Sequence, residues 1–540
     1  MRLKSGERLK DYGAKGVHFA LRRAGIAPEH VRARRLGAQA TNLPPPADGA
    51  PRVVFLSPRD WAVHVQCEGM IGQALRLRGA DVRIITCGGG LEICDRSTAW
   101  ESPPMPCSSC TRYLDNAVDA HGFDRLVIRD GWTPDGDAWP ELDALPAPAL
   151  IQIERDGLRL GRLVDIPAKW FLMSTQLDTD PLGPTTLRRF VRSAQRVARG
   201  LTAALDKLRP DVVVMLNGLF MFEGICWALC RQRGIPVVTY ERGLVKEMLV
   251  FRRDAPACWY EMPEAWAAWK DIPLTADEEA ELDEYTADRE LGNRTIDSFR
   301  QNARIERIQR PEGGRVATLF TNLTWDSAVI GRDVAFPSIQ AWLAAAVEAF
   351  AERPGDRLIV RVHPAEAEPP DRQTREPILS FLHERFPVLP PNISVVGADD
   401  TTSSYGLMAD TDFGMVYTTT VGLELALRGK PVIVAGQTHY RSKGFTVDVS
   451  NPVEFQSAIV RLLADPAACA PDRDLVRRYA YLLFLRVPLP SPGVEEHVRG
   501  LARITVKDLH ELAPGRSATL DRLCDGILGR GDFVPAPATN

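Results

Sequence analysis

The sequence lacks an apolar run long enough to span a membrane. The longest candidate, Val212 to Cys230, is interrupted by Asn217 and Glu223 and is better explained as a strand, a loop and a helix. The early apolar stretch Val17 to Leu21 contains His18 and is too short for the hydrophobic core of a secretion signal. We therefore expect a cytoplasmic protein.

Cysteine is sparse and charge is nearly balanced. Ten cysteines in 540 residues do not make a disulfide scaffold. A net charge of -4 gives no overall attraction to nucleic acid, so we expect no nucleic-acid partner. Basic residues gather near the N-terminus, where Arg22, Arg23, Arg34 and Arg35 stand in pairs. A solvated arm over residues 1–50 is the favoured interpretation, and peripheral contact with the inner face of an anionic membrane is the alternative.

What the sequence does contain is an alternation of short apolar runs and helical patterns. Strands are predicted at residues 52–57, 81–86, 125–131, 149–157, 211–218, 235–243, 315–323, 357–364, 393–397, 413–417 and 430–436. Buried strands alternating with helices indicate a parallel sheet covered on both faces, and a chain of this length exceeds one core. The predicted fold class is α/β, with two doubly wound domains that face a central cleft at their strand C-terminal edges.

Three threonines stand where one strand becomes a helix, in "FGMVYTTTVGLELALRGKPVIVAG" from Phe413. Thr418, Thr419 and Thr420 would lie at the helix N-terminus, where N–H groups and the helix dipole attract anions. Gly422 would allow close approach of a ligand. An ordinary capped crossover is the equal alternative for this segment.

A second polar motif, "RVHP", ends the strand that begins at Arg357. His363 and Pro364 should face the same edge of the sheet as the threonines, and His363 can donate to a phosphate. Arg361 could add positive charge, although the alternation of side chains along the strand could turn it to another face.

Together these segments resemble the capsule polysaccharide biosynthesis proteins, which are glycosyltransferase-like proteins of the two-Rossmann-domain GT-B type. The resemblance includes "HYRSKGFT" from His439, "FTNLTWDSAV" from Phe320, "RYAYLLFLR" from Arg478 and "LTADEEAELDEYTADRELG" from Leu274. It covers residues 211–486 and is densest after Arg315.

The resemblance implies sugar transfer from a nucleotide donor, with a CMP-sugar favoured, onto a surface polysaccharide or lipid-linked acceptor. It places His363, Pro364 and the threonines on the donor phosphate and Glu424 on the ribose. It also implies contact with polysaccharide assembly machinery.

The predicted divisions are an arm (1–50), an acceptor domain (51–271) with a Cys-rich insertion (87–110), a helical connector (272–314), a donor domain (315–470), C-terminal helices (471–530) and a disordered tail (531–540).

Such transfer needs no metal in principle, because donor groups can stabilise the leaving phosphate, but it needs a base for the acceptor hydroxyl. Asp326 and Glu241 are the preferred candidates, ahead of Asp60, His64 and Glu68. The predicted acceptor side comprises Asn217, Gly218, Arg441 and Lys443. A structural role is the alternative for each of these residues.

Four of the cysteines lie in one loop-rich stretch: Cys87, Cys94, Cys107 and Cys110. Four thiols with one C-x2-C pair suit a structural zinc ion, and an iron–sulfur cluster is less favoured. Unconnected thiols are the alternative, and no metal is predicted for catalysis.

Two other functions fit the same phosphate-binding parts: transfer of a polyol phosphate from a CDP donor, and isomerisation of a nucleotide sugar. A non-catalytic subunit that binds glycan or nucleotide in an assembly complex is a candidate from another class. Intact "RVHP" and threonine motifs favour an enzyme.

Overall fold

The computed structural model describes residues 16–17, 21, 26–101, 105–132, 139–294, 308–367, 372–498 and 500–537. The chain divides into two compact units. The first comprises Met1–Phe171, Leu177–Cys258 and Val487–Pro535, and the second comprises Leu172–Gln176, Trp259–Arg486 and Ala536–Asn540.

The first unit is built on a seven-stranded sheet in the order β13-β6-β5-β4-β1-β2-β3. Its parallel strands are β1 (Arg52–Leu56), β2 (Asp81–Thr86), β3 (Asp124–Val127), β4 (Val212–Leu216) and β5 (Val237–Arg242). Two antiparallel strands, β6 (Met248–Arg253) and β13 (Leu489–Pro490), extend one edge. β4 is buried along its whole length, as expected for a strand covered on both faces.

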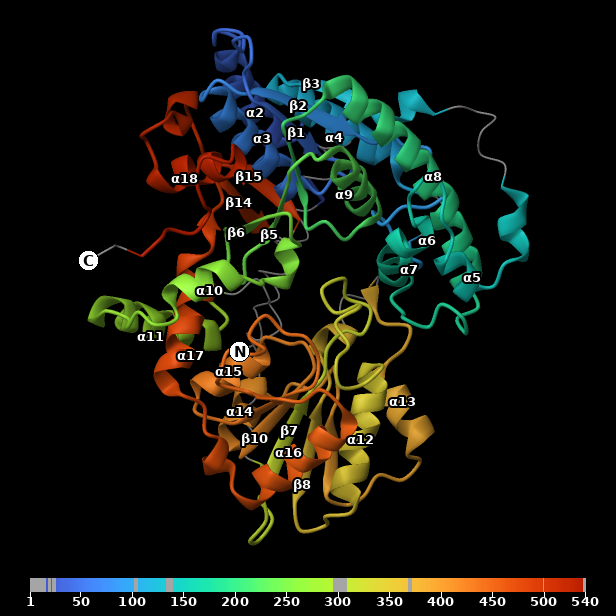
Figure 1. The fold of residues 1–540 in the computed structure, drawn as a ribbon, viewed down its shortest axis with the longest axis vertical. Helices are drawn as coiled ribbons and strands as arrows, with labels where there is room; N and C mark the ends of the chain where they lie inside the picture. The colour runs from blue at the N-terminus through green and yellow to red at the C-terminus, as the bar shows by residue number, and fades with distance from the viewer. Residues whose placement is uncertain are drawn as a thin grey trace. The chain divides into compact units, whose positions relative to one another are not determined.

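Helices precede and follow β1, β2 and β4 in the sequence, whereas β5 leads directly into β6 (Figure 1). The helices are α2 (Pro28–Ala40), α3 (Ala62–Arg76), α4 (Cys107–His121), α5 (Ala147–Ile151), α6 (Leu160–Leu163), α7 (Asp165–Leu172), α8 (Gly183–Leu208), α9 (Met221–Arg233) and α18 (Ala518–Ile527). The apolar side chains of α3 pack with Val53 and Phe55 of β1 in one core.

The second unit contains a six-stranded sheet in the order β12-β11-β10-β7-β8-β9, parallel throughout. The strands are β7 (Val316–Phe320), β8 (Arg357–Arg361), β9 (Ile393–Val396), β10 (Phe413–Val416), β11 (Val432–Val434) and β12 (Val447–Asp448). The helices are α10 (Pro263–Trp269), α11 (Ala276–Glu290), α12 (Ile339–Ala351), α13 (Ile378–Arg385), α14 (Ser404–Asp410), α15 (Val421–Leu427), α16 (Pro452–Ala464) and α17 (Arg473–Tyr481). In this core, α12 and α16 pack against β7, β8 and β10 (Figure 1).

Both sheets reverse their winding beside their first strand. In the first unit β1 lies between β2 and β4, and in the second unit β7 lies between β8 and β10. The loops that follow the two central strands leave in opposite directions at such a switch point, which opens a crevice at the carboxyl ends of the strands. The predicted α/β class with two doubly wound halves is therefore confirmed, and the strand order locates one candidate crevice in each unit.

The predicted N-terminal arm is wrong for residues 28–40. These residues form α2, and Ala33, Leu36 and Ala40 are buried in the first core. A Cβ added to Gly37 would come within 2.4 Å of the Ala120 carbonyl oxygen, so α2 and α4 approach each other at backbone distance. The preceding residues 1–15, where part of the basic charge lies, are outside the described residues.

Two further segments differ from the prediction. Residues 149–157 were expected to form a strand, but α5 occupies Ala147–Ile151 because Pro146 and Pro148 favour a helix start there. The predicted C-terminal helices include a hairpin instead, β14 (Val494–Val498) with β15 (Leu501–Ile504). In the tail predicted to be disordered, the ring of Phe533 stacks on Phe251 at 5.4 Å between centroids.

Residues 272–294 of the predicted connector belong to the second unit, and their role as a connector stays a prediction. Thr275 and Glu278 form a capping box at the start of α11. The connector residues 295–307 are outside the described residues. Within the described part of the chain, no helix is long and apolar enough to cross a membrane.

Candidate functional site

The switch point of the second sheet is lined by polar loops that are hydrogen-bonded to each other. The backbone N–H of Thr418, after β10, donates to Asn322 Oδ1 at 3.2 Å, and Asn322 follows β7. The N–H of His363, after β8, donates to Thr321 Oγ1 at 3.0 Å. Thr321 and Asn322 therefore join the ends of three neighbouring strands. Neither residue was predicted to be part of the site, although a polar pair directly after a buried strand was the available signal.

The hydrogen bonding of His363 defines which ring nitrogen can donate. Its Nδ1 accepts the N–H of Ala365 at 3.1 Å, where Pro364 starts a short 3-10 helix. A nitrogen that accepts carries no proton, so a neutral ring holds its proton on Nε2. Such a ring can donate from Nε2 to a ligand oxygen, as the predicted phosphate role requires.

The three threonines play different parts in the structure. Thr419 Oγ1 accepts the Val421 N–H at 3.3 Å, and the Thr420 side chain makes no capping bond to α15. Thr418 Oγ1 is buried and has no hydrogen-bond partner among the described residues. A buried hydroxyl without a partner is costly, and a bound anion or water would satisfy it.

Gly422 has a packing role in this segment. A Cβ at this position would lie 2.2 Å from Tyr440 Oη, and that hydroxyl donates to the Thr419 carbonyl oxygen at 2.5 Å. The absence of a side chain thus lets Tyr440 support the threonine loop. Close approach of a ligand, the reason given for Gly422 from the sequence, remains a prediction.

Glu424 is buried, and its carboxylate pairs with a side chain of the protein. It is 5% exposed, and its Oε1 accepts from Arg289 Nε at 3.1 Å and Nη2 at 2.9 Å. The neighbouring carboxylate raises the pKa of the Arg289 guanidinium, which also lies 5.2 Å from the Phe484 ring centroid. This ion pair fastens α15 to α11, so a ribose would compete with Arg289 for the carboxylate.

Two arginines that were predicted to bind ligands instead bind backbone groups within the second unit. Arg361 turns toward the β9 side, where its guanidinium donates to the Gly397 carbonyl oxygen at 2.5 Å, and burial lowers its pKa. Arg441 donates to the carbonyl oxygens of Val434, at 3.0 Å, and Val449, at 2.8 Å. Both guanidinium groups therefore bind backbone carbonyl oxygens. Arg361 is turned to another face, as predicted by the alternative that considered the alternation of side chains along the strand.

Two other predicted residues remain partly accessible on loops. Asp326, in the loop after β7, is half-buried, and its Oδ1 accepts the Ala328 N–H at 2.8 Å. Lys443 is half-buried in the loop between β11 and β12, and its charge helps to lower the pKa of His439. Both lie in the same unit as His363 and Thr418.

The predicted acceptor-side residues of the first unit lie together at its own switch point. Asn217, directly after β4, donates from Nδ2 to Glu241 Oε2 at 3.1 Å. Gly218 has φ +89° and would clash with the Trp227 ring if it carried a Cβ. Asn217 and Glu241 are thus brought together, while Gly218 is required by the turn.

A buried charged cluster, which the sequence analysis missed, lies beside them. Arg59, after β1, is 3% exposed and pairs with Asp95 at 2.7 Å and with Glu223. Asp95 also accepts the Met221 N–H at 2.8 Å, at the start of α9. Burial raises the pKa of Glu223 to about 7. A lone arginine in a loop gave no sequence signal for this network.

The three reserve candidates for a base differ in environment. Asp60 is paired with Arg96. Glu68 is buried and accepts from Ser57 and, at 2.7 Å, from Tyr240 Oη, and its burial raises its pKa to about 7. His64 is half-buried beside Tyr240, and burial together with the nearby Arg242 and Arg59 charges lowers its pKa to about 3.

The fold brings the four predicted cysteines together. Cys87, Cys94, Cys107 and Cys110 line a single pocket in the first unit. Among the described residues, however, no three thiol, imidazole or carboxylate groups are already arranged around a common point as metal ligands.

Comparison with known proteins supports the family resemblance over the second unit. Residues 277–468 match the family model described as capsule polysaccharide biosynthesis protein. This segment begins in α11 and contains Thr321, Asn322, His363, Thr418 and Glu424. The resemblance predicted from the motifs is therefore confirmed for this part of the chain. No curated protein sequence matches the chain.

Two solved structures illustrate a remote likeness. KpsC of Thermosulfurimonas dismutans, a beta Kdo 2,4 transferase, is 14% identical, with 56% of this chain and 86% of KpsC covered at a TM-score of 0.36. The UDP-GlcNAc 2-epimerase from Neisseria meningitidis is 11% identical, with 80% and 97% covered at a TM-score of 0.26. At these TM-scores the likenesses carry no argument about function.

The Arg289–Glu424 ion pair predicts a large stability effect. Glu424→Gln should destabilise the second unit by about 3–5 kcal/mol, because it leaves a buried guanidinium without its carboxylate. Urea unfolding should show this loss, and the double variant Arg289→Met/Glu424→Leu should recover much of it. A Glu424→Gln protein as stable as wild type, but unable to bind nucleotide, would instead favour the ribose role.

The raised pKa of Glu68 predicts a pH-dependent stability. The folded value is about 7 against 4.5 for an ordinary glutamate, so the folded state binds the extra proton. The contribution is full below pH 4.5 and is lost as pH rises through 7, at most about 3 kcal/mol. Glu68→Gln should therefore flatten the fall in melting temperature between pH 5 and 8, and the exposed-site control Glu384→Gln should not. Parallel curves for Glu68→Gln and wild type would refute the assignment.

Proposed function

We propose that the protein is a glycosyltransferase that moves a sugar from a nucleotide donor, with a CMP-sugar favoured, onto a capsule or other surface polysaccharide or lipid-linked acceptor. The observation that carries the proposal is the polar switch point of the second sheet, where the Asn322–Thr418 bond and His363 lie within the segment matched to the capsule family. Crevices of this kind hold ligands in doubly wound sheets. Contact with an assembly complex or membrane surface is part of the same proposal.

The chemistry of this crevice suits a nucleotide phosphate. His363 Nε2–H and the Thr418 hydroxyl are the donors that we propose for the phosphate oxygens. As the bond between the sugar and the phosphate breaks, negative charge grows on the phosphate oxygen. Donors already in position stabilise that charge without reorganising. We propose that this stabilisation operates without a catalytic metal.

The acceptor hydroxyl must lose a proton during transfer, and Asp326 and Glu241 are the carboxylates that we propose for this step. Both are half-buried, with Asp326 in the loop after β7 and Glu241 near the end of β5. Asp326→Asn and Glu241→Gln should separate them: the variant of the true base should lose about 10²-fold or more in kcat and keep its nucleotide affinity. Unchanged transfer in both variants would exclude both as the base.

Nucleotide binding is the direct test of the proposed function. We expect calorimetry to show CMP binding that exceeds binding of CDP, UDP and GDP. His363→Ala should weaken CMP binding by about 10- to 150-fold, because one charge-assisted hydrogen bond is worth about 1.5–3 kcal/mol. His383→Ala is the matched control, because His383 is an exposed histidine on α13 of the same unit.

The alternatives predict different outcomes of that titration. A preference for UDP or GDP would contradict the proposal of a CMP-sugar donor, but it would remain consistent with a glycosyltransferase. Preference for CDP would favour transfer of a polyol phosphate. Absence of binding to all four nucleotides would overturn the enzyme proposal in favour of a non-catalytic subunit.

A further inference from the structure

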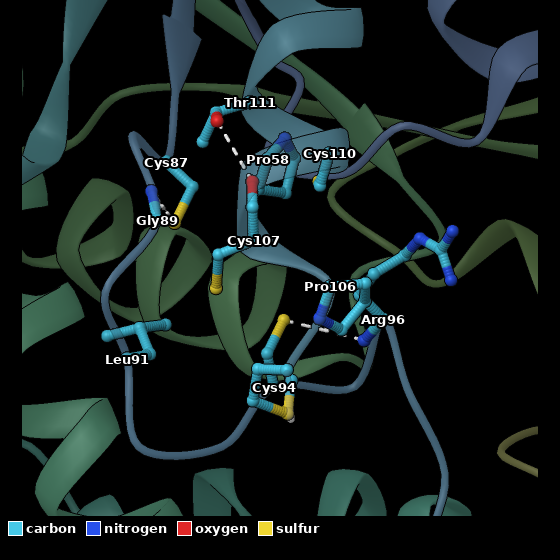
Figure 2. Close-up of a pocket in the computed structure, with 11 residues that line it drawn as sticks. Pro58, Cys87, Gly89, Leu91, Cys94, Arg96, Pro106, Cys107, Cys110 and Thr111 are labelled. Atoms are coloured by element: carbon cyan, nitrogen blue, oxygen red, sulfur yellow. Dashed lines mark hydrogen bonds between the residues drawn. The ribbon is translucent and has the colours of Figure 1, made fainter. Parts of the chain in front are cut away.

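The four clustered cysteines come from two segments that meet in the first unit. Cys87 directly follows β2 and Cys94 lies in the loop after it, while Cys107 and Cys110 occupy the first turn of α4. The pocket that they line is small, with a cavity volume of about 20 Å³. Figure 2 shows the four cysteines among the residues that line this pocket.

The two loop cysteines share a backbone arrangement. The Gly89 N–H donates to Cys87 Sγ at 3.4 Å, and the Arg96 N–H donates to Cys94 Sγ, also at 3.4 Å (Figure 2). In both cases the donor lies two residues after the cysteine. Hydrogen bonds to sulfur favour the thiolate, which is the form that binds metal.

The glycines after Cys87 are required by this turn. Gly88, Gly89 and Gly90 all have positive φ, between 76° and 93°. A Cβ on Gly88 would lie 2.3 Å from Val127 Cγ1, and one on Gly89 would lie 3.2 Å from Cys107 Cβ. The turn therefore brings Cys87 close to the start of α4, which carries the C-x2-C pair.

We propose that Cys87, Cys94, Cys107 and Cys110 bind a structural zinc ion. One Zn²⁺ replaces four thiol protons, which pass to solvent, and four zinc–sulfur bonds form without any redox change. Rotation about χ1 moves each sulfur between staggered positions, so the thiols of one pocket can converge on the ion. Four thiolates without histidine or carboxylate make a closed tetrahedral set, as in structural zinc sites.

The zinc ion would also position the charged cluster of the first switch point. Asp95 directly follows Cys94 and binds both Arg59 and the start of α9. Loss of the ion would release the loop that carries Asp95. The site therefore belongs to the architecture of the first crevice and is independent of donor binding in the second unit.

Metal analysis of the full-length protein tests this inference. We expect about one zinc and no iron per chain after gel filtration, with zinc lost in Cys94→Ser and in Cys107→Ser. Cys469→Ser is the control, because Cys469 is a half-buried thiol in the second unit and its variant should keep zinc. Zinc retained by both cluster variants, or absent from wild type purified with zinc present, would overturn the proposal.

A second measurement does not depend on the folding of the variants. Removal of zinc from wild type by a chelator should expose about four additional thiols to a thiol reagent, and added Zn²⁺ should protect them again. An unchanged thiol count would contradict the site. Iron with visible charge-transfer absorption would overturn the zinc assignment in favour of an iron–sulfur cluster.

Discussion

The bond from the Thr418 N–H to Asn322 spans the place where the second sheet reverses its winding. At that place two adjacent parallel strands end in loops that run to opposite faces, so a crevice is a consequence of strand order. Without a bond across the crevice, the two loops could separate. With it, and with His363 held by Thr321, the donors of three strand ends keep fixed positions. The proposed phosphate chemistry depends on this prior arrangement, because fixed donors stabilise charge without a cost of reorganisation.

At the switch point of the first sheet, buried charged groups hold the loops in place. Arg59 occupies this switch point and is held by Asp95 and Glu223 in an environment that excludes water. Such a network contributes little net stability, since desolvation offsets much of the attraction, but removal of one partner is costly. The network therefore fixes where β1, α9 and the cysteine-containing loop lie relative to each other. The two units thus use neutral hydrogen bonds at one switch point and ion pairs at the other.

Local pattern was enough to predict both doubly wound halves and the positions of the strand-end motifs. The apolar runs marked most of the strands, whereas the order of the strands within each sheet was not predicted. Partners distant in sequence were not predictable. Glu424 stood on the helix predicted to bind the ribose, but nothing in the sequence paired it with Arg289, 135 residues away. The role of Arg59 was missed for the same reason, and α2 was mistaken for a solvated arm because its basic residues concealed a buried face formed by Ala33, Leu36 and Ala40.

The central claim is that a donor nucleotide binds at the switch point of the second sheet. Hydrogen–deuterium exchange with and without saturating CMP measures where binding protects the backbone. The account predicts slower exchange in peptides that contain Thr321–Asn322, His363–Ala365 and Thr418–Val421, with little change at Asn217–Gly218. Protection confined to the first unit, or its absence at these three loops while CMP is bound, would contradict the account.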